Sequence, residues 1–272
     1  MPQETLDKKE AIKRLVHTAV ESYSTGFQAR HEGELDDPEG TLNMKIHNVF
    51  IAVLGPEIQY YTALVRSLDS SLGNMLEKLA INIAKFSYEV SQSVEGTLSL
   101  SQTQDVAELL EKYKRREIKP PTVDDYQFLR VKPNEESLVS KRHDSDYYLV
   151  DRETGENFLI ELKIGGDLDN KKARSEKEAL LEQFAILSNT LPRDAKIKMF
   201  FATAYNRYGE GKPWRQERVR QFFSDEELLI GRDFWNFVCK SDEGYDIVLD
   251  AYKEKAGLIK SALDSIKQTY LG

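Results

Sequence analysis

The stretch that decides the fold is residues 144–163, DSDYYLVDRETGENFLIELK. Two short apolar runs, 147–150 and 158–160, flank a polar segment that contains Gly155. Aromatic and branched residues on either side of a turn are typical of a β-hairpin. The sequence therefore predicts two antiparallel strands joined by a turn near residue 155.

Charged residues gather at one end of this hairpin. Asp146 directly precedes the first apolar run, and the second run ends in Glu161 and Lys163. Because side chains alternate along a strand, Glu161 and Lys163 are expected on the same face. Asp144 has the same strand parity as Asp146, so alternation does not decide between them; we favour Asp146 because it abuts the strand.

These residue types suit metal-dependent phosphodiester hydrolysis. Magnesium prefers oxygen ligands, usually carboxylates together with water and substrate phosphate. Asp146 and Glu161 are candidate ligands, and the Leu162 carbonyl is a candidate third one. Lys163 is expected beside the attacking water, where it would orient this water or stabilise charge on the phosphate.

A solvated hairpin with ordinary surface charges is the alternative interpretation. The chain contains six triplets with an acidic residue two positions before a lysine. Only the triplet at 161–163 closes an apolar run and follows a strand that begins with aspartate across a glycine-containing turn. This combination favours a functional site.

An aspartate, a hairpin and then Glu-x-Lys resemble the PD-(D/E)xK nuclease superfamily, which includes many type II restriction endonucleases. One departure is Ser145, which stands where the family motif has proline. The resemblance extends to residues 67–85, similar to the helix that directs a glutamate toward the metals in such enzymes. It implies a catalytic role for Glu77.

Residues 200–223 and 231–238 also resemble the TdeIII-type restriction endonucleases, which implies cleavage at GGNCC. The resemblance implies hydrolysis of both strands of double-stranded DNA at a short palindrome, with 5′-phosphate products and a cognate DNA methyltransferase to protect the host. Cleavage of both strands of a palindrome requires two symmetry-related sites, so a homodimer is expected.

Composition predicts a cytoplasmic protein that does not enter a membrane. The charged N-terminus lacks the apolar core of a signal peptide. The longest apolar run, 49–54, is too short to cross a bilayer. The single cysteine, Cys239, excludes an intramolecular disulfide and suits a reducing compartment.

The net charge of −8 is unevenly distributed. Residues 111–220 hold 23 basic and 20 acidic residues, a net +3, whereas the segments before and after carry −7 and −4. The basic residues thus gather around the proposed site, as expected for an enzyme that binds a polyanion locally.

The remaining pattern predicts one α/β domain over 1–272 with a central mixed β-sheet flanked by helices. The resemblance implies that this domain has a restriction-endonuclease-like core. Residues 1–118 are expected to be mainly helical, and 119–272 to hold the hairpin, sheet and DNA-recognition part. Helical periodicity predicts one long or two abutting helices at 57–92, and helices at 11–23, 105–117 and 175–189. The last would begin with a capping box of Ser175 and Glu178. The Ser/Gln-rich residues 91–104 read as a loop, and 196–205 as a strand parallel to the catalytic one.

Two basic clusters are candidate DNA contacts. The segment 205–220 is expected to read bases, because arginine pairs bidentately with guanine in the major groove. Its candidates are Arg207, Lys212, Arg215 and Arg218, with Arg215 and Arg218 one turn apart on a short helix that starts near Pro213. Candidate phosphate contacts are Lys171, Lys172 and Arg174. Ion pairing, phosphate binding or simple solvation of these residues are the alternatives.

At the level of function, a repair or junction-resolving nuclease and a non-catalytic DNA-binding protein are the other interpretations.

Overall fold

The computed structural model describes residues 2–130 and 138–272. The chain divides into two compact units, one formed by Met1–Ile83 with Asp246–Gly272 and the other by Ala84–Tyr245. We call them the helical unit and the sheet unit. The expectation of one domain over 1–272 stays a prediction.

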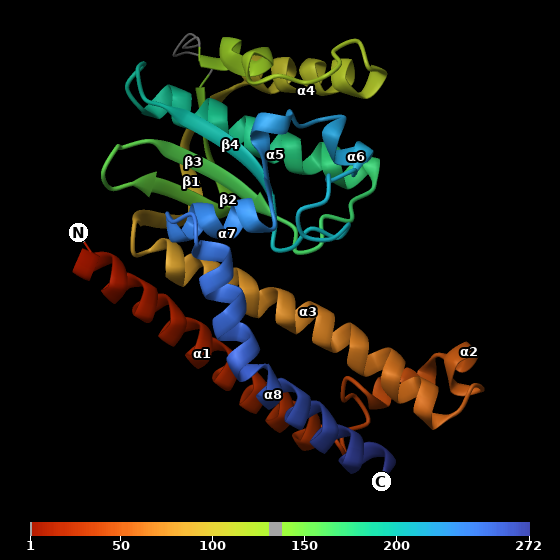
Figure 1. Ribbon diagram of the computed structural model, residues 1–272. Coiled ribbons are helices and arrows are strands. Elements are labelled where there is room, and N and C mark those ends of the chain that lie inside the picture. The colour runs from red at the N-terminus through yellow and green to blue at the C-terminus, as the bar shows by residue number, and fades with distance from the viewer. Residues whose placement is uncertain (1, 131–137) are drawn as a thin grey trace. The chain divides into compact units, whose positions relative to one another are not determined.

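The sheet unit is built on a five-stranded mixed sheet (Figure 1). Its strands, in chain order and in spatial order, are β1 (Tyr88–Ser99), β2 (Leu138–Asp151), β3 (Asn157–Leu162), β4 (Ile197–Thr203) and β5 (Leu228–Ile230). The first three are antiparallel, and β3, β4 and β5 run parallel. The parallel step from β3 to β4 is possible because helix α5 (Asn170–Thr190) connects them. The predicted α/β class with a mixed sheet is confirmed.

Helices cover both faces of this sheet (Figure 1). On one face α5 buries Leu180, Phe184 and neighbours against Leu159 and Phe201, and α4 (Leu100–Arg115) packs against α5. On the other face lies α7 (Arg232–Cys239), whose Phe237 ring centroid is 5.0 Å from that of Phe158. The shorter helices of this unit are η2 (Val123–Arg130), α6 (Glu217–Arg220) and η4 (Asp225–Glu227).

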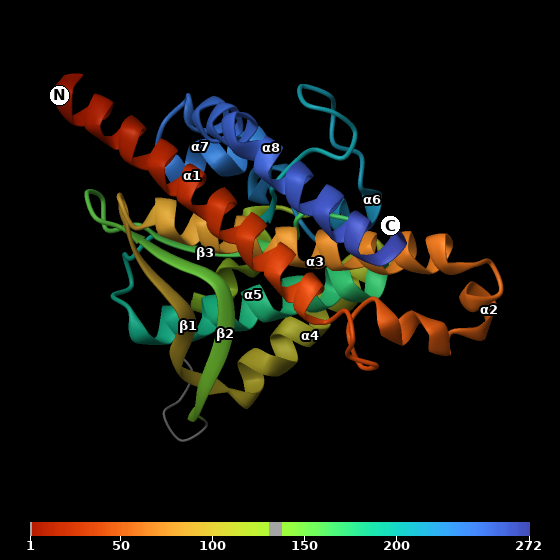
Figure 2. The same cartoon turned by 90° about the horizontal axis from the view of Figure 1, so that it is seen from below.

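The helical unit contains three long helices, α1 (Pro2–Gly33), α3 (Pro56–Ala84) and α8 (Gly244–Leu271). Helices α1 and α8 run side by side (Figure 2), joined by an ion pair between Glu21 and Lys255. Between α1 and α3 the chain forms η1 (Asn43–His47) and the short α2 (Val49–Ala52). Apolar side chains from all three long helices, Phe27, Leu64 and Ile266 among them, form one core cluster.

Several predicted elements differ from the structure. The helix expected to run to residue 92 ends at Ala84, and the loop expected at 91–104 is strand β1 followed by the start of α4. Helix α5 begins at Asn170 with Asp169 as its N-cap, so the predicted capping box at Ser175 is wrong. Pairing with β2 along nearly its whole length makes β1 a strand, and the local cap by Asp169 sets the start of α5.

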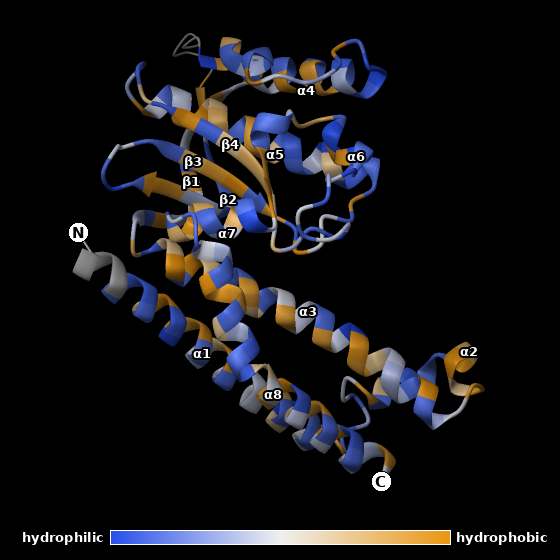
Figure 3. Cartoon of the chain, in the orientation of Figure 1, coloured by the Kyte–Doolittle hydropathy of each residue, from blue (hydrophilic) through white to orange (hydrophobic). Residues whose placement is uncertain are grey.

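Hydropathy follows this arrangement, with apolar residues concentrated on the strands and on the helix faces that meet them (Figure 3). Within the part of the chain that the structure describes, none of the helices combines the length and the apolar character that crossing a bilayer requires.

Candidate active site

The hairpin register brings Asp146 and Glu161 side by side. Tyr147 and Ile160 are the last registered pair at this end of the hairpin, and extending the register by one residue places Asp146 opposite Glu161. Directly opposed residues of an antiparallel pair point to the same face of the sheet. The Leu162 backbone N–H donates to Asp146 Oδ2 at 2.9 Å, which holds that carboxylate over the end of β3.

The Lys163 ammonium lies among three carboxylates. It donates a hydrogen bond to Glu161 Oε1, and its Nζ lies 3.8 Å from Asp146 Oδ2. The third carboxylate belongs to Glu176 of α5, whose Oε1 is 3.5 Å from Nζ. Glu161 is nearly buried, whereas the other three side chains keep partial contact with solvent. The site is therefore open to solvent on one side and closed by the sheet on the other.

Burial and charge repulsion act together on Glu161. Its burial, reinforced by the neighbouring Asp146 charge, raises the pKa of the Glu161 carboxyl above its ordinary value. The pKa of Lys163 is lowered by burial but raised more strongly by Glu161, Asp146 and Glu176, so it lies above the usual range. Lys163 accordingly stays protonated at neutral pH. A raised carboxyl pKa beside a persistent cation is typical of a functional site.

The donor set of this site fits a hard divalent cation. Carboxylate oxygens from Asp146, Glu161 and Glu176 face one region, and the Asp146 charge contributes to the raised pKa of Glu161. A cation would relieve this repulsion. Among the described residues, no group of three or more acidic, histidine or cysteine side chains is already arranged to hold a metal. The Lys163 ammonium lies where the three carboxylates converge.

A glycine turn connects the site to α5. Gly166 follows Lys163 with φ +62° in the left-handed region, and a Cβ built there would lie 2.7 Å from Thr203 Cγ2. A side chain at this position would therefore be strained and would clash. The chain then enters α5 through Asp169, whose side chain accepts from the Lys172 N–H at 2.8 Å. This short path places Glu176 beside Lys163.

Asp144 and Leu162 have different surroundings from Asp146. The exposed Asp144 is registered opposite Ser93 on the other side of β2, and its carbonyl accepts from Gln183. The structure thus brings Asp146, rather than Asp144, against Lys163. The Leu162 N–H is used by Asp146, while the role of its carbonyl as a ligand stays a prediction.

Glu77 lies on α3 of the helical unit, whereas Asp146, Glu161 and Lys163 belong to the sheet unit. Its side chain is partly buried and takes part in an interaction within the protein. The catalytic role that the resemblance implies for Glu77 stays a prediction.

The predicted base-reading segment is partly engaged in contacts within the sheet unit. Arg207 pairs with Asp167 at 2.6 Å, and the Arg215 guanidinium lies over the Tyr208 ring at 5.3 Å. Lys212, Arg215 and Arg218 are exposed. The predicted helix from Pro213 is wrong: α6 begins at Glu217, so Arg215 lies before it.

The predicted phosphate contacts lie in the first turns of α5. Lys171 and Lys172 are exposed, whereas Arg174 pairs with Glu111 of α4 at 3.3 Å. Exposed cations at a helix N-terminus close to Glu176 suit a backbone phosphate approaching the site. Their DNA-binding role stays a prediction.

Glu176 is the site residue that the sequence analysis missed. It stands in a helix with Glu178 and Glu182 close by, so its charge alone does not distinguish it. The available signal is its position on the first helix after the Glu-x-Lys strand.

A mixed sheet with covering helices, carrying carboxylates and a lysine at the end of a central hairpin, defines a class of phosphodiester hydrolases. The chain matches the model of the family described as "Type II restriction endonuclease, HinfI" over residues 8–256. It therefore belongs to this family of type II restriction endonucleases, and DNA is the substrate that the family implies. No curated protein and no solved structure matches the chain.

Proposed function

We propose that Asp146, Glu161 and Lys163, assisted by Glu176, form the active centre for magnesium-dependent cleavage of both strands of duplex DNA. The observation that carries the proposal is the convergence of three carboxylates on the Lys163 ammonium at the end of the hairpin. The TdeIII resemblance makes GGNCC the first palindrome to test. As a DNA-cutting enzyme, the protein is proposed to act in the cytoplasm.

Each residue has a distinct role in the proposed reaction. Asp146 and Glu161, with the Leu162 carbonyl, would hold magnesium, which polarises the scissile phosphate and lowers the pKa of a bound water. Lys163, held beside these carboxylates by its hydrogen bond to Glu161, would stabilise negative charge on the phosphate or orient the attacking water. Glu176 keeps the ammonium oriented. Attack by water displaces the 3′ oxygen and leaves a 5′-phosphate.

The basic residues of the sheet unit would bind the DNA on both sides of the scissile bond. Lys171 and Lys172, at the start of α5, suit phosphates near the cut. Arg215 and Arg218 suit guanine contacts, with Lys212 beside them. For Arg207 and Arg174 to bind DNA, their contacts with Asp167 and Glu111 would have to be exchanged.

The proposed reaction also implies partners. Two active centres related by a twofold axis are needed to cut a palindrome on both strands, so the enzyme is proposed to act as a homodimer. A cognate DNA methyltransferase would protect the host sites. Glu77 is retained as a proposed additional catalytic carboxylate.

Digestion of a sequenced phage DNA tests the proposal. Wild-type protein with magnesium should give discrete fragments whose ends report the target and the 5′-phosphates, and chelation should abolish cutting. Lys163→Ala should lower cleavage by about 100-fold or more while DNA binding is retained. The matched control is Lys198→Ala, a lysine on β4 that pairs with Glu156 instead. Full activity of Lys163→Ala would refute the assignment.

A further inference from the structure

The helical unit exposes a group of large apolar side chains around α2. Phe50 and Val53 are 84% and 81% exposed. They belong to a set that we call the α2 patch, which consists of Val49, Phe50, Val53, Leu54, Ile58 and Val65. Figure 3 shows this part of the chain as strongly hydrophobic. Single exposed apolar residues are ordinary on protein surfaces, but several large ones gathered in one short segment of chain are typical of an interaction site.

Exposed apolar residues also lie on helix α3, so the α2 patch is not confined to the segment around α2. Tyr60 and Leu64 on one side of α3 are buried in the core of the helical unit. Ile58 and Val65, seven residues apart and so on one face, are exposed on another side of the same helix. A helix that is apolar on two faces needs a second partner surface, and the helical unit covers only the first.

The patch is also almost free of charge. Between residues 43 and 65 the only formal charges are those of Lys45 and Glu57, which cancel, although the whole chain carries −8. Two identical copies that meet through this segment would avoid the like-charge repulsion that most of the surface would impose. The neutrality favours association of the chain with itself.

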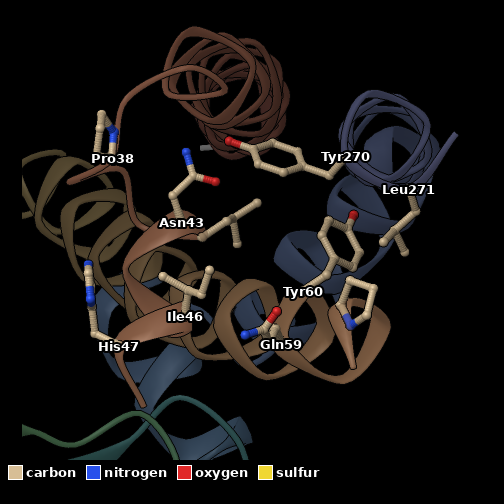
Figure 4. Close-up of a pocket in the computed structure, with 10 residues that line it drawn as sticks. Pro38, Asn43, Ile46, His47, Gln59, Tyr60, Tyr270 and Leu271 are labelled. Carbon is tan, nitrogen blue, oxygen red and sulfur yellow. The ribbon is translucent and has the colours of Figure 1, made fainter. Parts of the chain in front are cut away.

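A cavity of about 430 Å³ adjoins the patch in the same segment of chain (Figure 4). Ile46, Tyr60 and Tyr270 line it, and so does Pro56, two residues after the patch residue Leu54. The exposed Phe50 thus lies in the chain segment between two residues that line this cavity, His47 and Pro56. In a twofold interface the same surface meets itself, so each copy can offer both a protrusion and a recess.

The exposed area agrees with what a dimer needs. Six side chains of this size expose on the order of 100 Å² each, about 600 Å² in all. A standard interface covers about 800 Å² per partner, of which roughly 500 Å² is apolar in homodimers. The patch supplies that amount.

We propose that the α2 patch is the surface through which two copies of the chain form a twofold dimer. The choice of a second copy as the partner rests on the proposed double-strand cleavage as well as on the neutrality and area of the patch. Phe50 and Val53 are the central anchors of this surface.

Sedimentation velocity of the full chain without DNA tests the proposal across a concentration series. The wild type should sediment with twice the chain mass of 31.3 kDa. Phe50→Glu/Val53→Glu should raise the dimer dissociation constant by about 100-fold, as expected when central anchors are replaced. Ile58→Glu/Val65→Glu, on α3, should act in the same direction. Leu100→Glu, at an apolar residue of the sheet unit that is 66% exposed, is the matched control and should stay dimeric.

Two results would overturn the proposal: a wild type that stays monomeric, or a dimer that neither double variant weakens. Circular dichroism verifies that each variant is folded, and the two variants change separate elements. Because the measurement contains no DNA or metal, it is independent of cleavage. Lys163→Ala should remain dimeric, so failure of the active-site assignment and failure of the interface are distinguishable.

Discussion

The buried ion pair between Lys177 of α5 and Glu227 gives the sharpest test of how the sheet unit is held together. Both side chains are essentially inaccessible to solvent, and the ammonium donates a hydrogen bond to the carboxylate. The ammonium also lies 4.8 Å from the centroid of the Tyr126 ring and 4.9 Å from that of Phe223. We predict that Lys177→Met strongly destabilises this unit.

The expected loss of stability depends on the buried carboxylate that Lys177→Met leaves unpaired. Methionine fills a similar volume, but Glu227 becomes a buried charge without its cation. Removing one partner of a buried pair costs about 3–5 kcal/mol, and the lost cation–π contacts belong to that amount. Burial lowers the pKa of Lys177 in spite of Glu227, so the intact pair already carries a desolvation cost. Neutralising both partners should therefore recover much of the loss.

Urea denaturation followed by tryptophan fluorescence measures this effect. The two tryptophans of the chain, Trp214 and Trp235, both belong to the sheet unit, so the signal reports its unfolding. Lys177→Met and Glu227→Gln should each lower the free energy of unfolding by about 3–5 kcal/mol, and the double variant by clearly less than their sum. A Lys177→Met protein within about 1 kcal/mol of wild type would refute the reasoning.

Three further predictions concern the candidate active site and its DNA contacts. Glu176→Gln should lower magnesium-dependent cleavage about 10–100-fold in single-turnover assays, as substitutions of supporting groups do in other metal sites. The nearby Glu178→Gln is the control and should not lower cleavage. Equal losses in the two variants would contradict a special role for Glu176. Because the folded-state pKa of Glu161 is raised, the folded metal-free protein holds this proton more tightly than the unfolded chain does. The stability that Glu161 contributes should therefore be fully present below its ordinary pKa and be lost as pH rises through the raised pKa. Melting temperatures measured in EDTA at pH 5 and 8 test this: Glu161→Gln should show a smaller decline than the wild type, and equal declines would count against it. Arg215→Ala should weaken binding to the cognate site by about 1–3 kcal/mol in titrations at fixed salt. An equal loss of affinity for random DNA would show instead that Arg215 contacts the DNA phosphate backbone.

The sequence predicted the hairpin well because its signals are local. Alternation, a glycine turn and flanking charges all lie within 144–163, and the observed register joins β2 and β3 across that turn. The parallel placement of β4 followed from the intervening helix. Strand β1 was missed because YEVSQSVEGTLS has few strongly apolar residues. It is a strand because β2 supplies its hydrogen-bond partners, which no local pattern records.

The site was predicted in part for the same reason. Asp146, Glu161 and Lys163 lie on one hairpin, so strand parity and register bring them together. Glu176 comes from the next element, and only the packing of α5 decides which of its acids faces the sheet. The segment predicted to read bases, 205–220, shows the limit of periodicity. Trp214 is buried, and its ring centroid lies 6.0 Å from that of Phe201. The backbone around residue 214 is set by this packing and does not form a continuous helix.

Helix α5 connects the stability of the sheet unit to the geometry of the active site. Glu176 and Lys177 are consecutive, so they point in directions about 100° apart around the helix axis. One reaches Lys163 and the other reaches Glu227 in the core. Since the buried Lys177 pair fixes the rotation of α5, it also fixes the direction in which Glu176 points. Loss of that pair should therefore impair cleavage even at temperatures where the protein remains folded, whereas Glu176→Gln should impair cleavage without loss of stability.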